Sequence, residues 1–159
     1  MELYLMQHGE AQPAEVDPAR PLTDKGRAEV QRVAARAAPL GLPLDGVYHS
    51  GILRAQQTAE IVAGALGGGL AVEARGGLAP LDEVEPVARW LIEEHLQGRR
   101  RGLLLVGHLP FLSRLVGRLV TGNEATEVLE FRMGGLVKLV GRPHSDRFVV
   151  AWALPPELA

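Results

Sequence analysis

Short apolar runs alternate along the chain with longer stretches that are apolar on one side only. Leu3–Met6 is short, apolar and followed by a His-Gly pair, a pattern that predicts a buried strand ending in a turn. In Thr23–Ala38 apolar residues return at helical spacing after a threonine suited to an N-cap, which predicts a helix. The pair is repeated, because Gly46–Tyr48 predicts a strand and Ala55–Leu66, which ends at glycines, predicts a helix.

A third pair follows in the middle of the chain. Leu70–Glu73 is strand-like, and Val84–His95 carries a clean amphipathic stripe that predicts a helix. Asp82 and Glu85 resemble a capping box at the start of this helix.

The last third of the chain contains one more pair and then a different pattern. Leu103–Val106 predicts a buried strand, and Pro110–Leu119 predicts a helix with proline in its first turn. Leu136–Val140 and Phe148–Trp152 are strand-like runs separated by the turn-rich segment Arg142–Asp146, which predicts a hairpin. We therefore expect an α/β three-layer sandwich: a mostly parallel central sheet, helices on both faces and the C-terminal hairpin at the sheet edge.

Length and composition limit the protein class. The 159 residues suffice for one compact domain, so we expect a single domain over residues 1–159. Hydrophobic residues make up 47% and charged residues 23%, which is typical of a soluble globular protein. Leu3–Met6 is too short for a signal or membrane segment, so we expect a cytoplasmic location and no membrane partner.

Charge and cysteine content exclude several kinds of function. The net charge of -2 gives no general attraction to nucleic acid, and the basic run Arg99–Arg101 is expected to be a solvated turn beside a helix C-terminus. Aromatic residues make up only 4%, too few for a strand-binding surface. The absence of cysteine excludes disulfides, thiolate metal sites and a cysteine nucleophile.

Candidate chemistry gathers where the predicted strands end. In open α/β sheets, ligands bind beyond the carboxyl ends of the strands. Four polar segments leave these ends: Gln7–Glu10, His49–Gly51 followed by Arg54, Pro80–Glu83 and Gly107–Pro110. His8, His108 and Arg54 are therefore among the residues that share one edge of the predicted sheet.

These residue types suit phosphoryl transfer. A neutral imidazole such as that of His8 can attack phosphorus through one ring nitrogen when a backbone carbonyl holds the other, and Gly9 would let the chain turn tightly beside it. Arg54 can grip two phosphate oxygens with its planar fork. A protonated His108 would add another charged donor.

Four stretches carry a resemblance to a known family. LMQHGEA, RPLTDKG, HSGILRAQQTAEIV and VGHLP, which end at Pro110, resemble the histidine phosphatase superfamily, nearest to its small SixA-type phosphohistidine phosphatases. The resemblance implies that His8 is the phosphorylated nucleophile, that Arg54 and His108 bind the phosphoryl group, and that Arg20 lies near the pocket rim. It also implies a reaction that needs no metal or other cofactor.

One residue departs from the family pattern. The superfamily usually has arginine immediately before the nucleophile, and this chain has Gln7, which donates only a neutral hydrogen bond. Losing one preorganised transition-state donor costs roughly 100- to 1000-fold in rate. We expect Gln7 and Gly9 to contact the phosphate, and we hypothesise that Arg20 or a protonated His49 supplies part of the missing charge.

The proton donor is the second open point. Larger members of the superfamily use an acidic residue to protonate an alkoxide leaving group, whereas SixA-type members lack a clear one. Asp82 and Glu83 stand in the right neighbourhood, although helix capping explains Asp82 equally well, and Glu10 is another candidate. A phosphohistidine substrate eases the requirement, because its P–N bond breaks to give imidazole. The sequence therefore favours a phosphorylated histidine protein as the partner.

Three alternatives stay open. A zinc hydrolase would use His8, His49 and His108, although the usual closely spaced ligand pairs are absent. A weakly active domain that binds phosphohistidine proteins fits Gln7, and a small phosphate ester is an alternative substrate. The chain has little length for a lid, which favours an open pocket, and we expect a monomer. Outside the site, we expect His95 to pack in the core and His144 to lie in a solvated turn.

Overall fold

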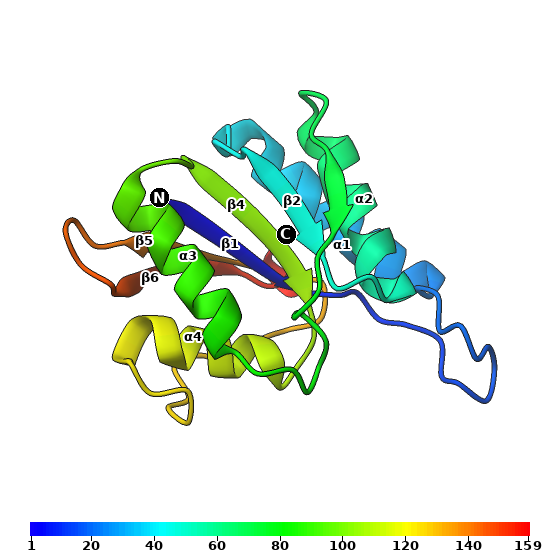
Figure 1. Cartoon of the computed structure of the whole chain (residues 1–159). Helices are drawn as coiled ribbons and strands as arrows, with labels where there is room; N and C mark the ends of the chain where they lie inside the picture. Colours follow the sequence, from blue (N-terminus) through cyan, green and yellow to red (C-terminus); the bar gives the residue numbers. More distant parts are fainter.

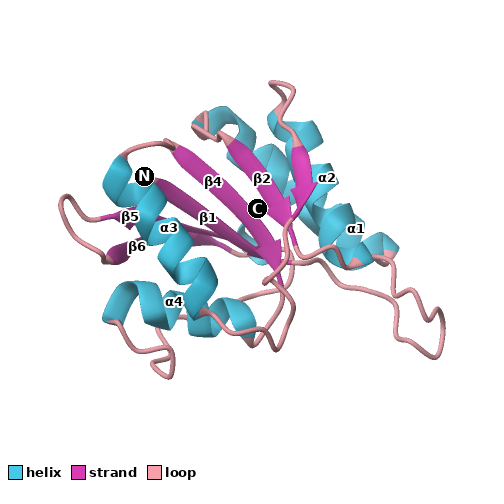
Figure 2. Ribbon diagram, in the orientation of Figure 1, coloured by secondary structure: helices cyan, strands magenta, loops and turns pink.

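The computed structural model describes residues 1–159 and has a central sheet between two pairs of helices (Figures 1 and 2). The strands are β1 (Glu2–Gln7), β2 (Gly46–His49), β3 (Val72–Ala74), β4 (Gly102–Gly107), β5 (Leu136–Gly141) and β6 (Phe148–Leu154). The helices are α1 (Asp24–Ala37), α2 (Leu53–Leu66), α3 (Glu85–Gln97), α4 (Phe111–Thr121) and the 3-10 turns η1 (Ala38–Leu40) and η2 (Pro156–Leu158). The predicted third strand begins two residues later than expected, at Val72.

The sheet order is β3-β2-β4-β1-β5-β6. β1, β4, β2 and β3 run parallel, whereas β5 is antiparallel to β1 and β6 is antiparallel to β5. β1 lies in the interior of the sheet, with Leu3 opposite Leu103 of β4 and Leu139 of β5. The expected parallel sheet with an antiparallel hairpin at its edge is confirmed.

Alternate residues of β1 supply the two cores. Leu3 and Leu5 pack with α3 and α4 on one face, while Tyr4 and Met6 pack with α1 and α2 on the other. All four side chains have 0% exposure, as expected of a central strand covered on both faces. The three-layer architecture follows from this alternation. None of the helices combines the length and apolar character that a membrane span requires.

The helix starts confirm one sequence expectation and correct another. Thr23 caps α1, since its side chain accepts a hydrogen bond from the Gly26 amide. The capping box expected from Asp82 and Glu85 is wrong, because α3 begins at Glu85 without a side-chain cap. Asp82 instead accepts a hydrogen bond from the Ala79 amide at 2.9 Å and so closes the preceding turn.

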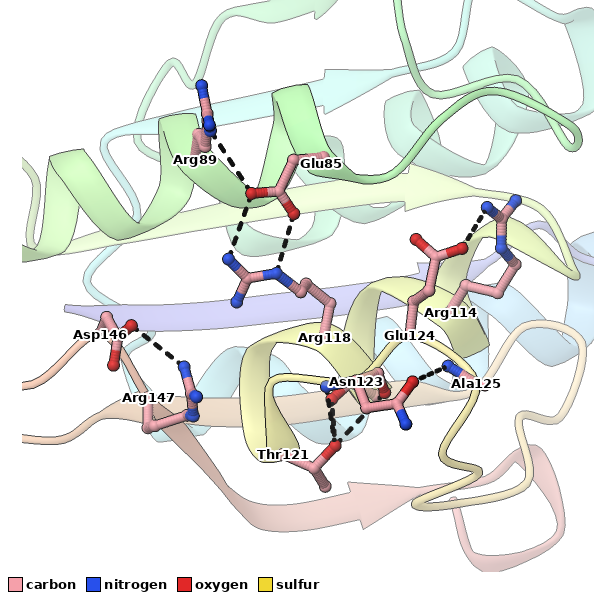
Figure 3. Close-up of polar contacts among 11 residues, drawn as sticks. Glu85, Arg89, Arg114, Arg118, Thr121, Asn123, Glu124, Ala125, Asp146 and Arg147 are labelled. Atoms are coloured by element: carbon pink, nitrogen blue, oxygen red, sulfur yellow. Dashed lines mark hydrogen bonds and ion pairs between the residues drawn. The ribbon is translucent and has the colours of Figure 1, made fainter.

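Glu85 joins two helices rather than capping one. Its carboxylate accepts hydrogen bonds from both Nε (2.8 Å) and Nη2 (3.2 Å) of Arg118 on α4, and it also pairs with Arg89 (Figure 3). Arg114, one turn earlier on α4, pairs with Glu124 at 2.7 Å. The Glu85–Arg118 pair fixes α4 against α3 in addition to their shared core, and the Arg114–Glu124 pair holds the segment after α4.

The remaining polar features lie away from the carboxyl ends of the parallel strands. The basic run pairs with acids: Arg99 and Arg100 contact Glu94, and Arg101 contacts Asp45. The ring of His95 packs 5.3 Å from the ring of Phe148 between centroids, which confirms its packing role. His144 is exposed in the hairpin turn, as expected.

Candidate active site

Neighbouring parallel strands bring the two expected histidines together. His8 directly follows β1 and His108 directly follows β4, and the last residues of these strands, Gln7 and Gly107, are register partners. The two imidazole rings therefore leave the same sheet edge, with centroids 5.1 Å apart. Arg54 lies in the first turn of α2, which follows β2 at the same edge (Figure 1).

The ring of His8 is held in one orientation. Its Nδ1 lies 2.7 Å from the carbonyl oxygen of Gly9, and because a carbonyl only accepts, Nδ1 carries the proton. The lone pair is therefore on Nε2, where Nε of Arg54 donates a hydrogen bond at 3.3 Å. Burial, followed by the charges of Arg54 and Arg20, lowers the pKa of His8, so the ring is neutral at pH 7. A neutral imidazole with an unprotonated Nε2 can act as a nucleophile.

The turn after His8 is anchored to α2 by hydrogen bonds and packs closely against α1. The Gly9 amide donates to Oγ1 of Thr58 at 3.0 Å, and the Thr58 hydroxyl donates to the Arg54 carbonyl at 2.8 Å. Gly9 does not have a positive φ, so the turn beside His8 does not need glycine for its backbone conformation. Glycine is needed for close approach instead, since a Cβ there would lie 2.9 Å from Cγ2 of Val30 on α1.

Two arginines give the site its positive charge. Arg54 contacts His8, and Arg20 donates from Nε to the Gln12 carbonyl at 3.0 Å. Arg20 lies close enough to contribute to the lowered pKa values of His8, Arg54 and His108. The site therefore holds two guanidinium groups without a carboxylate between them, which suits a multiply charged anion.

His108 is almost fully buried, with 1% exposure. Its Nε2 lies 2.7 Å from Oγ of Ser50, and its Nδ1 is buried with no hydrogen-bond partner. Burial, followed by the charges of His8, Arg54 and Arg20, lowers the pKa of His108 to about 4. His108 is therefore neutral at pH 7 in this structure, in contrast to the protonated donor expected from the sequence.

Gln7 and His49 differ in their relation to this cluster. The Gln7 carbonyl accepts a hydrogen bond from the Gly134 amide at 3.0 Å, and its side-chain amide makes none within the chain. His49 is buried and accepts a hydrogen bond at Nδ1 from the Gly51 amide. Burial lowers the pKa of His49, and the charged side chain that acts on it is Glu60, which is not part of the cluster. The structure therefore lends no support to a protonated His49 as the missing charge.

None of the candidate acids contacts the nucleophile. Asp82 closes the turn at Ala79, as described above, and Glu83 is exposed without a hydrogen bond. Glu10 accepts a hydrogen bond from the Thr23 hydroxyl at 2.9 Å and pairs with Lys25 at 3.6 Å. Glu83 is the candidate whose carboxylate is not engaged elsewhere.

Three supporting residues escaped the sequence analysis. Thr58 anchors the turn after His8, Ser50 contacts His108, and the Gly134 amide donates to the carbonyls of Gln7 (3.0 Å) and His8 (3.2 Å). Thr58 could have been found from the sequence, because it lies four residues after Arg54 and therefore on the same face of α2. Gly134 gives no such signal, since it approaches His8 only through the pairing of β5 with β1.

A metal site is not assembled. No three His, Cys, Asp or Glu side chains lie together in a way that would hold a metal ion, so His8, His49 and His108 do not form the zinc site of the alternative interpretation.

Comparison with known proteins gives a consistent result. The model of the histidine phosphatase superfamily (branch 1) matches residues 3–82. The chain is 37% identical to an uncharacterised protein of Picosynechococcus sp., over 87% of this chain and 84% of the relative. It is 32% identical to the phosphohistidine phosphatase SixA of Escherichia coli, over 77% of this chain and 76% of that protein.

The solved structures agree with the sequence relatives. A structure of the protein histidine phosphatase SixA complexed with tungstate superposes with a TM-score of 0.85 at 28% identity, covering 98% of this chain and 97% of that chain. The order of the motifs, the sheet topology and the convergence of His8, Arg54 and His108 lead to the same assignment. The chain belongs to the histidine phosphatase superfamily and is a hydrolase of the phosphatase type.

Proposed function

We propose that this protein removes phosphoryl groups from phosphohistidine on a protein, through a phosphorylated His8 intermediate and without a metal. The observation that carries the proposal is the state of the His8 ring. The bond from Nδ1 to the Gly9 carbonyl leaves Nε2 unprotonated, with its lone pair toward Nε of Arg54 at 3.3 Å. A single nitrogen is thereby prepared for attack beside a donor for the phosphoryl oxygens.

In the first step, Nε2 of His8 attacks phosphorus in line with the leaving group. The new N–P bond forms as the bond from phosphorus to the substrate nitrogen breaks, and the substrate ring, which carries a proton on its other nitrogen, takes that electron pair and leaves as neutral imidazole. Arg54 and Arg20 would stabilise the charge on the non-bridging oxygens, and the unpartnered Nδ1 of His108 would contact one of them. A solved structure of SixA is a complex with tungstate, a tetrahedral oxyanion, which supports oxyanion binding by a protein of this fold.

In the second step, water attacks the phosphorus of phospho-His8. The N–P bond breaks, its electrons return to Nε2, and inorganic phosphate leaves with the oxygen of water. The nucleophile is regenerated as the neutral ring, in keeping with the lowered pKa of His8. Both steps use the same hydrogen-bond donors, because the phosphoryl group lies between them and Nε2 of His8 during its transfer and again during its hydrolysis.

Two features support a protein-borne substrate over a small phosphate ester. None of the candidate acids contacts His8, and imidazole needs less help as a leaving group than an alkoxide does. Exposed leucines also follow three of the strands that end at the site: Leu53 (36% exposed), Leu81 (82%) and Leu109 (37%). Apolar side chains near the mouth of an anion site favour a protein surface around the phosphoryl group.

The test compares the wild-type protein with His8→Ala on a phosphohistidine protein, an aryl phosphate and a sugar phosphate. We expect rapid quenching under alkaline conditions to trap an acid-labile phosphoryl group on wild-type His8, followed by release of phosphate with chelator present. His144→Ala is a matched control, because His144 is exposed in the distant hairpin turn. Tight binding without turnover would instead identify a docking domain, and preference for the sugar phosphate would overturn the substrate assignment.

Substitution of Glu83 tests whether the reaction uses a general acid. If phosphohistidine is the substrate, Glu83→Gln should leave its hydrolysis within about threefold of wild type, because imidazole leaves without the full proton transfer that an alkoxide requires. A loss of roughly 100-fold on the phosphohistidine protein would show instead that Glu83 is the general acid.

A further inference from the structure

We infer that Ser50 is a positioning residue that fixes the proton of His108 on Nδ1 and thereby makes this nitrogen a donor to the phosphoryl group. The inference rests on the proposed function for its role in catalysis. The tautomer itself is a property of the resting protein and is open to measurement without any substrate.

The hydrogen bonds of the Ser50 hydroxyl carry the inference. Its oxygen accepts a hydrogen bond from the Ile52 amide at 3.2 Å and lies 2.7 Å from Nε2 of His108. A hydroxyl has one proton to donate, and the acceptor that the protein offers to this one is Nε2 of His108. If Nε2 carried the ring proton, Ser50 would accept twice and its own proton would have no acceptor in the protein. The serine therefore donates to Nε2, and the single proton of the neutral ring is on Nδ1.

The other ring nitrogen explains why this choice matters. Nδ1 of His108 is buried and has no hydrogen-bond partner in the protein. A buried donor without a partner costs about 1–3 kcal/mol, and this cost disappears when an acceptor arrives. A phosphoryl oxygen beside His8 is such an acceptor, because the two rings lie 5.1 Å apart. The hydrogen bond from Nδ1 of His108 forms only when the phosphoryl group is present. It therefore stabilises the reacting complex and not the resting protein.

The fold holds Ser50 in place for this contact. Ser50 directly follows β2, whose last residue His49 is the register partner of Val106 on β4, two residues before His108. The Arg75 amide donates to the His49 carbonyl at 2.8 Å, and Gly51 has a φ of 87°, a conformation that side chains disfavour. The serine is thus fixed from both sides, opposite the histidine that it orients.

A purely structural role for Ser50 makes a different prediction. The bond from the Ile52 amide to Ser50 is a local turn that begins α2, and Ser50→Ala would remove it together with the contact to His108. Ser145 makes the same local bond, accepting from the Arg147 amide at 3.1 Å in the distant hairpin. Ser145→Ala is therefore a matched control that removes a turn bond without touching a histidine.

The decisive experiment is nitrogen-15 NMR of the histidine rings at pH 7, combined with kinetics of the variants. We expect wild-type His108 to be protonated at Nδ1 and unprotonated at Nε2, and Ser50→Ala to lose this preference. We also expect Ser50→Ala to lower kcat by about 10- to 100-fold with a smaller change in KM, Ser50→Thr to restore most of kcat, and Ser145→Ala to match wild type.

The outcomes separate this inference from the proposed function. A wild-type His108 ring protonated at Nε2 would overturn the role of Ser50, whatever the activity. Equal kcat for Ser50→Ala and Ser145→Ala would overturn its catalytic part. If no phospho-His8 forms in the wild type, the proposed function fails, while the NMR measurement still decides whether Ser50 sets the tautomer. Because that measurement uses the wild-type protein, it does not depend on whether Ser50→Ala folds.

Discussion

The hydroxyl of Thr58 offers a sharp test of how the nucleophile is supported. Thr58 has 0% exposure and accepts the hydrogen bond of the buried Gly9 amide at 3.0 Å. Thr58→Val keeps the shape of the side chain and a similar helix propensity, so the main loss is the acceptor. A buried amide left without a partner costs about 1–3 kcal/mol. The second bond, to the Arg54 carbonyl, adds little because that carbonyl can keep its helical hydrogen bond.

The cost should appear in both stability and activity. We expect the free energy of unfolding to fall by about 1–3 kcal/mol, and Tm to fall by roughly 2–12 °C at about 2–4 °C per kcal/mol for a chain of this size. Urea unfolding and calorimetry measure these values. We also expect kcat to fall, because Gly9 holds Nδ1 of His8. Thr58→Ser keeps the acceptor and should stay near wild type. A Thr58→Val protein as stable as Thr58→Ser would refute the anchoring of Gly9 by this hydroxyl.

Further predictions concern charge and pH. Arg20→Ala should weaken inhibition by tungstate or phosphate at least several-fold, because Arg20 contributes to the positive charge of the site. Unchanged inhibition would show that Arg20 does not replace the arginine that is usual at the position of Gln7. Gln7→Arg should strengthen the same inhibition by about 10-fold or more, since a charged hydrogen bond contributes about 1.5–3 kcal/mol. Weaker inhibition, seen as a higher Ki, would show that the site does not accommodate a further cation. Since burial lowers the pKa of His8, the acid limb of kcat/KM should lie below pH 6.5, and a limb above 6.5 would contradict a buried nucleophile. The pKa of His108 falls from 6.5 to about 4, so the unfolded state binds more protons between these values. The free energy of unfolding should therefore decrease as pH falls through that window, and urea titrations should show a steeper decrease for wild type than for His108→Gln, in which the slope from His8 and His49 remains.

The sequence predicted the layers because they follow from local patterns. Each apolar run became a strand of the sheet, and the turn-rich Arg142–Asp146 segment became the expected hairpin connection. The prediction failed where a contact between two helices overrode a local capping pattern. Asp82 and Glu85 matched a capping pattern, but Glu85 found a partner on another helix, Arg118, which no spacing within its own segment could reveal.

The site shows the same division. His8, Arg54 and His108 could be grouped from the sequence because each follows a strand of a parallel sheet, and such strands end at one edge. The role of Ser50 depends on the register between β2 and β4, and that of Gly134 on the pairing of β5 with β1. The protonation of His108 was wrongly anticipated because burial, which lowers its pKa, is a property of the whole packed layer.

The interior position of β1 has a consequence for biosynthesis. This strand leaves the ribosome before both of its neighbours in the sheet, Gly102–Gly107 and Leu136–Gly141, which are translated long afterwards. Its apolar residues have no strand partners until these neighbours have been translated, and growing chains with exposed apolar strands are vulnerable to aggregation. The site around the nucleophile at its end can be assembled only after β4 and β5 have been translated. Incomplete chains should therefore be clients of chaperones and proteases, and carry no unregulated phosphatase activity.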